Sequence, residues 1–248
     1  MSALPHSSIP IQNILRSATA ACDLASLAHE VQQHYSASQL AAIASSAPPG
    51  EARAAAVVLG WIGAMEVTPA LAQALHHRDP DVVRMAEGAL WRIWFRAAGE
   101  SAQAALFQCI QRRQRDRYPS PIRAISKIIR EHATFAEAYN QRALAEYLND
   151  SYESALKDYR RALHLNPLHF AARTGEGHCH VLLGRYAEAL SCYHAALQIH
   201  PRMEGVRQLI RRINDVLGDA RRPVVPARQR WMPAPLPIGS MLRRYPKS

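Results

Sequence analysis

The sequence predicts an all-α protein, folded as a right-handed α-solenoid of helix–turn–helix repeats and followed by a disordered C-terminal tail. Three observations predict this fold class. One residue pattern occurs twice at a spacing of 34 residues, two Ala-rich segments before it are offset by 31 residues, and prolines concentrate after Gly218. Repeats of this length each bury one apolar face against their neighbours, whereas closely spaced prolines block a helix.

The N-terminal segment begins with residues 1–20, in which serine and proline predict poor order. A helix is expected over about 22–35. Ser36 or Ser38 can cap a short helix after it, because a serine hydroxyl accepts a hydrogen bond from a free backbone N–H. That helix should end near the Pro-Pro-Gly cluster at 48–50.

Two Ala-rich helices follow, over residues 52–62 and 83–93, with Arg, Ala, Leu and Ile at matching positions. Between them lie an amphipathic helix at 68–77 and an Arg-Asp-Pro-Asp turn at 78–81. Proline and acidic residues favour a helix start, where an N–H is dispensable and negative charge is stabilised. This order resembles HEAT repeats across about residues 38–96.

Three aromatic residues cluster within 82–95, the stretch that most resembles the inner helix of a HEAT unit. Trp91, Trp94 and Phe95 fall on about one turn of that helix. We predict that they pack the junction with the next element. An exposed aromatic anchor for a partner is the alternative.

The strongest pattern lies in the C-terminal half of the chain. The positions that recur 34 residues apart are Tyr152, Ala155, Leu156, Tyr159, Ala162, Leu163 and Pro167, followed by Tyr186, Ala189, Leu190, Tyr193, Ala196, Leu197 and Pro201. The pattern resembles the tetratricopeptide repeat (TPR). Two TPR units are therefore predicted at 136–169 and 170–203, with a degenerate unit at 102–135 and a capping helix at 204–217. The order as a whole resembles uncharacterised bacterial HEAT/TPR proteins.

Certain repeated positions are predicted to have structural roles. Tyr159 and Tyr193 should fill the gaps between units. The prolines after Asn166 and His200 should stop the second helices. Asp150 or Ser151 can cap the second helix of its unit, and Gly184 should make the equivalent turn in the next unit.

The TPR resemblance implies a concave groove lined by the first helix of each unit. The matching positions here are Glu137, Asn140, Leu144, Tyr147, Leu148, Thr174, His178, Val181 and Leu182. Chaperone-binding members of the family clamp a carboxylate with lysine, arginine and asparagine. Those lysine and asparagine positions hold other residue types here, so an extended or helical segment with apolar anchors is the expected ligand.

No pattern predicts chemistry. The sequence lacks a nucleophile elbow, a phosphate-binding loop, a dinucleotide fingerprint and a His-Glu helix pair. His178 and His180 are two residues apart and would point to different faces of a helix. Cys179 and Cys192 fall on the two helices of one unit and could approach each other. We therefore predict no catalytic residue, metal site or cofactor, and no enzymatic activity.

Charge leaves an alternative function open. The net charge is +10, and residues 219–248 hold seven basic residues and one acidic residue. Together with the basic segment 112–130, this tail favours a nucleic-acid-associated accessory protein as the alternative. An anionic membrane surface, a proline-recognising domain and the chain's own groove are further possible partners for the tail.

The leading hypothesis is a non-enzymatic adaptor that binds a protein or peptide segment in the TPR groove. No apolar run is long enough to span a membrane. Residues 1–12 do not resemble a secretory signal, so a cytoplasmic location is expected. The predicted organisation is a poorly ordered N-terminus, HEAT-like repeats, a TPR array and a basic tail, at residues 1–20, 21–99, 100–218 and 219–248.

Overall fold

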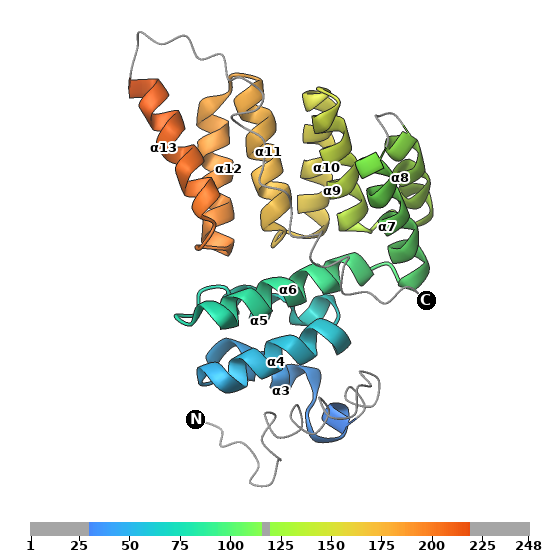
Figure 1. The fold of residues 1–248 in the computed structure, drawn as a ribbon, viewed down its shortest axis with the longest axis vertical. Helices are drawn as coiled ribbons and strands as arrows, with labels where there is room; N and C mark the ends of the chain where they lie inside the picture. The colour runs from blue at the N-terminus through green and yellow to red at the C-terminus, as the bar shows by residue number, and fades with distance from the viewer. Residues whose placement is uncertain (1–29, 116–119, 219–248) are drawn as a thin grey trace.

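The computed structural model describes residues 30–115 and 120–218, and within them all side chains except those of 112–115 and 120. Every regular element in these ranges is helical, and successive helices pack against one another (Figure 1). The predicted all-helical class is therefore confirmed for this part of the chain. The predicted poorly ordered N-terminus and the basic tail lie outside the described residues, as do the side chains of 112–117 in the basic segment.

The first block contains four α-helices and a short 3-10 turn. These are α3 (Ala37–Ser46), α4 (Pro49–Ile62), η1 (Met65–Val67), α5 (Thr68–Ala74) and α6 (Pro80–Arg96). Ser36 caps α3 as expected, with Gln39 completing a capping box. The segment 48–50 does not separate the helices widely, because Pro49 is itself the first residue of α4, where its fixed φ suits the helix. Asp79 caps α6 by accepting hydrogen bonds from Asp81 N and Val82 N.

The second block is a series of antiparallel helices. These are α7 (Glu100–Arg115), α8 (Ser120–Glu131), α9 (Ala136–Leu148), α10 (Tyr152–Leu165), α11 (Phe170–Leu182), α12 (Tyr186–Ile199) and α13 (Glu204–Gly218). Helices α10 and α12 end immediately before Asn166 and His200, as the prolines predict. We refer to α9 with α10 and to α11 with α12 as the two complete units.

The turn inside each complete unit uses a left-handed residue. Asp150 has φ of 59° and Gly184, 34 positions later, has φ of 74°. The prediction of a side-chain cap at Asp150 or Ser151 is wrong, because Ser151 makes no side-chain capping bond. The Asp150 carboxylate instead accepts a hydrogen bond from the Tyr152 hydroxyl at 2.5 Å.

Two tyrosines hold neighbouring helices together. A Cβ atom at Gly175 would overlap the ring of Tyr159, and one at Gly177 would contact the ring of Tyr193. Tyr159 comes from α10 and therefore joins the first unit to the second, as predicted. Tyr193 packs on α11 within its own unit. The glycines are required because each ring lies directly on the α11 backbone.

Helix α6 crosses the ends of the second block rather than continuing its stack. Figure 1 shows α6 running beneath the lower ends of the helices from α9 to α12. Trp94 stacks on His169 in the α10–α11 turn, with ring centroids 4.4 Å apart, and also contacts Phe170. Farther along the second block, Arg202 Nη2 donates hydrogen bonds to the carbonyl oxygens of His77 and Arg78.

The aromatic cluster of α6 forms the core of this junction. Trp91, Trp94 and Phe95 are each at most 2% exposed. Trp91 packs edge-on against His169 and Phe170, and Phe95 stacks on Phe107 of α7. The prediction that these three residues pack the junction with the next element is therefore confirmed.

Candidate functional site

The nine predicted groove positions lie on α9 and α11. Leu144, Leu148 and Leu182 are partly exposed. The others are 9% exposed or less within the folded chain, namely Glu137, Asn140, Tyr147, Thr174, His178 and Val181. The register from the repeat therefore selects one face of each helix, but most of that face has contacts inside the protein.

Glu137 is a fully buried carboxylate with three hydrogen-bond donors. Its Oε1 accepts from Gln141 Nε2 at 2.6 Å and from Asn140 Nδ2 at 3.2 Å. Its Oε2 lies 2.8 Å from His169 Nε2, and the His169 side chain is also fully buried. A buried carboxylate is tolerated only when its oxygens are satisfied in this way. Glu137 therefore anchors the start of α9 to the α10–α11 turn.

The hydrogen bonds assign the tautomer of His169. Its Nδ1 caps α11 by accepting from Ala172 N at 3.2 Å, so the ring proton lies on Nε2 and is donated to Glu137. One face of the ring stacks on Trp94 of α6. His169 thus links α6, α9 and α11, a role that the repeat pattern does not predict.

His178 and Val181 face the second helix of their own unit. His178 Nδ1 lies 2.7 Å from the Tyr193 hydroxyl, and burial lowers the pKa of His178 to about 4. Val181 is fully buried in a cluster that includes Tyr193 and Val206. Both side chains therefore stabilise the second unit.

A polar network occupies the interface between the degenerate unit and the first complete unit. Arg142 donates from Nε and Nη2 to the two Asp158 carboxylate oxygens, at 2.5 and 2.8 Å. It also donates from Nη1 to Ser126 Oγ of α8 at 3.0 Å. Glu146 lies one turn after Arg142 on α9, and its Oε2 is buried without a hydrogen-bond partner in the described part of the chain. Partial burial, and then the charge of Asp158, raise the pKa of Glu146 to about 7.

This raised pKa predicts a pH-dependent stability. Between the ordinary pKa of 4.5 and about 7, the folded chain retains a proton that the unfolded chain has lost, so stability falls as pH rises through that window. We expect Glu146→Gln to match the wild type near pH 4 and to be more stable by about 1 kcal/mol near pH 8, because the half-solvated carboxylate keeps part of its hydration. Urea denaturation at both pH values measures this. Equal stabilities near pH 8 would contradict it.

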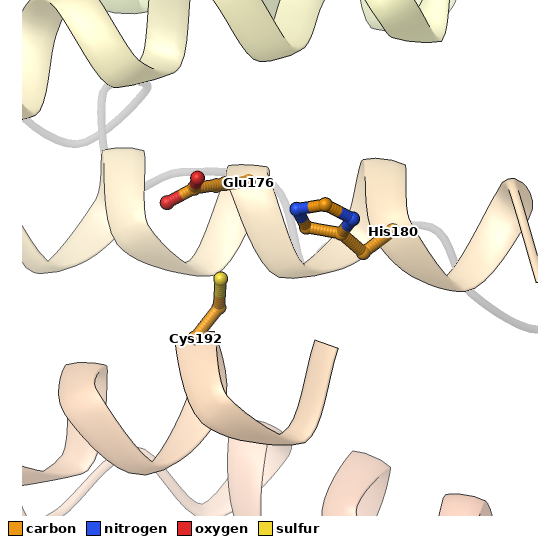
Figure 2. Close-up of side chains that lie close together, drawn as sticks. All are labelled: Glu176, His180 and Cys192. Atoms are coloured by element: carbon orange, nitrogen blue, oxygen red, sulfur yellow. The ribbon is translucent and has the colours of Figure 1, made fainter. Parts of the chain in front are cut away.

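The same positions in the second complete unit hold different chemistry. Thirty-four residues after Arg142, Glu146 and Asp158 come Glu176, His180 and Cys192. One ligand atom from each of these three buried side chains lies within 4.8 Å of the other two. Figure 2 shows His180 and Glu176 along one side of α11, with the Cys192 sulfur of α12 pointing toward them. Glu176 also accepts hydrogen bonds from Arg160 at 3.1 Å and Arg173 at 3.0 Å.

Sequence reasoning missed this cluster because it compared histidines and cysteines with each other. Glu176 and His180 are four residues apart, a spacing that places both on one helix face. Cys192 follows on the helix that the repeat pairs with α11. The spacing together with the repeat register could have found the cluster.

The described cysteines are free thiols. Cys109, Cys179 and Cys192 are all buried, as predicted. Burial raises the pKa of Cys179 and raises that of Cys192 to about 12, so both thiols are protonated near neutral pH. Within the described ranges, no helix is both long and apolar enough to cross a membrane. The chain matches no protein-family model and no curated protein sequence.

Proposed function

We propose that the chain is a non-enzymatic adaptor that binds an extended or helical segment of another protein. The observation that carries this proposal is the set of partly exposed leucines at equivalent groove positions. Leu148 on α9 and Leu182 on α11 are 34 residues apart, and Leu144 lies one turn before Leu148. Apolar surface on adjacent helices favours a ligand with apolar side chains, at about 25 cal/mol for each Å² removed from water.

The proposal includes the finer architecture. The 34-residue spacing of Tyr159 and Tyr193 supports a TPR-type array, and the matching residues in α4 and α6 support HEAT-like helices before it. In this interpretation the helix pairs form a right-handed solenoid. The residues that differ between units determine ligand specificity, because the repeated residues are committed to packing.

Binding is tested by charge substitution at the partly exposed leucines. A partner is first captured from lysate with the full chain and identified. Leu144→Arg and Leu182→Arg should then each weaken binding of that purified partner by about tenfold or more, because each places a charge against an apolar ligand side chain. Tyr147 and Val181 are unsuitable for this test, because their burial makes a charged replacement unfold the unit.

The matched control is Leu197→Arg. Leu197 is also partly buried, but it lies on α12, away from the groove positions. The control should bind normally, and circular dichroism should show equal helix content in all variants. Equal binding by all three variants would contradict the groove proposal. Salt-sensitive retention on DNA or RNA that disappears when residues 219–248 are deleted would favour the nucleic-acid alternative.

A further inference from the structure

We propose that Glu176, His180 and Cys192 bind a divalent transition-metal ion of the zinc class. The ligands would be one carboxylate oxygen, one imidazole nitrogen and the Cys192 thiolate. Zinc takes these three ligand types in proteins, in tetrahedral sites whose fourth position is filled by another protein group or by water. The proposal does not depend on peptide binding by the groove.

The donor atoms are already gathered. The three ligand atoms lie within 4.8 Å of one another, whereas ligands of a tetrahedral zinc ion lie about 3.3–3.8 Å apart, given bonds of about 2.0–2.3 Å. Small rotations of the side chains suffice to close this difference. The two helices are held in register by Tyr193, whose ring lies on Gly177 between the two α11 ligands. Little ordering is therefore left for the ion to impose.

His180 has no competing partner. Its ring makes no hydrogen bond with the residues that the structure describes, its Nδ1 is buried, and the residue is 4% exposed. Burial lowers the pKa of His180, so the ring is neutral near pH 7 and can donate a lone pair. A buried polar ring without a partner costs free energy, which binding of an ion would recover.

The two arginines are compatible with ligation by Glu176. A carboxylate offers about four lone-pair positions, and Arg160 and Arg173 occupy one on each oxygen. Carboxylates that bind metals are commonly held by such additional hydrogen bonds, which fix their orientation. The arginine contacts therefore position the Glu176 carboxylate beside Cys192.

Comparison of the two units separates this cluster from ordinary repeat packing. At the same three positions the first complete unit has Arg142, Glu146 and Asp158, and Arg142 satisfies Asp158 as an ion pair. The second unit has lost the arginine and the aspartate and carries a carboxylate, an imidazole and a thiol instead. The thiol and imidazole select against Mg²⁺ and Ca²⁺, which prefer oxygen ligands.

Metal binding must displace a proton. The ion binds the sulfur, the S–H bond breaks, and one proton leaves to solvent with no change in oxidation state. Because burial, together with the Glu176 charge, holds the pKa of the Cys192 thiol at about 12, affinity should rise with pH. Cys179 is also buried on α11, but it is not part of the cluster.

The experiment uses the full chain with Zn²⁺ and with Co²⁺ as a spectroscopic substitute. We expect one Zn²⁺ per chain in competition with a chromophoric chelator, and a thiolate-to-cobalt charge-transfer band with Co²⁺. Cys192→Ser and His180→Gln should each weaken Zn²⁺ binding by more than about 100-fold, and Cys192→Ser should abolish the band. Zn²⁺ should also raise the Tm of the wild type but not of Cys192→Ser.

Two controls are Cys179→Ser, which removes the nearby buried thiol, and His194→Gln, which removes an exposed imidazole of α12. Both should bind Zn²⁺ like the wild type. The chain has 12 histidines, so binding unchanged in Cys192→Ser and His180→Gln would place the ion elsewhere and overturn the proposal. Absence of the thiolate-to-cobalt band in the wild type would overturn it even if a variant failed to fold.

Discussion

Replacing Glu137 with leucine should lower the free energy of unfolding by about 3–5 kcal/mol, because it removes the acceptor from a fully buried network. His169 Nε2, Gln141 Nε2 and Asn140 Nδ2 all direct their N–H groups at this carboxylate. Leucine has a similar volume, so the loss reports unsatisfied donors rather than a cavity. Urea denaturation followed by circular dichroism measures the change.

The matched control for this substitution is Glu137→Gln. Glutamine keeps one acceptor oxygen, so it should lose less stability than leucine does. Amide hydrogen exchange adds a local readout, because weakening of His169 should raise exchange at the start of α11, whose Ala172 N–H is capped by the same ring. A leucine variant as stable as the wild type would show that the network contributes nothing net.

Trp94→Ala is the second large expected effect, a loss of about 3–5 kcal/mol. Trp94 is 2% exposed and packs on His169, Phe170 and Trp91. Removing the indole leaves a cavity where α6 meets the α10–α11 turn. Thermal and urea denaturation should both show the loss, with the two blocks no longer unfolding in one transition.

Trp61 supplies the comparison within the same block. Its ring is only partly buried and lies under the Arg92 guanidinium, 4.5 Å from the centroid. Trp61→Ala should therefore cost only about 1 kcal/mol. If the two alanine variants lose equal stability, the junction with the second block does not carry the energy assigned to Trp94.

The helices were predictable because their local signals agree with one another. Prolines at 167 and 201 mark the ends of α10 and α12, and the Asp79-Pro80 pair marks the start of α6. The capping helix predicted at 204–217 is α13, which ends one residue later. Each signal acts within a few residues, so one sequence is enough to find it.

The surroundings of the groove positions were less predictable. The repeat register places Glu137 on the predicted face of α9, but it does not reveal that His169 and Trp94 cover that end of the helix. That contact joins residues more than 30 positions apart in the sequence. The Glu176 cluster likewise depends on how α11 faces α12. Such arrangements follow from packing between helices, which periodicity within one helix does not encode.

Helix α6 also limits the length of the array. In an open solenoid each repeat touches only its neighbours, so repeats can be added or lost without redesign. Here the two ends of α6 and its preceding turn meet different inter-unit turns, through Trp94 at His169 and through His77 and Arg78 at Arg202. An inserted unit would separate these turns farther than one helix of 17 residues can reach. The helix therefore acts as a ruler, and a lineage that gained or lost a repeat would have to change the length of α6 at the same time.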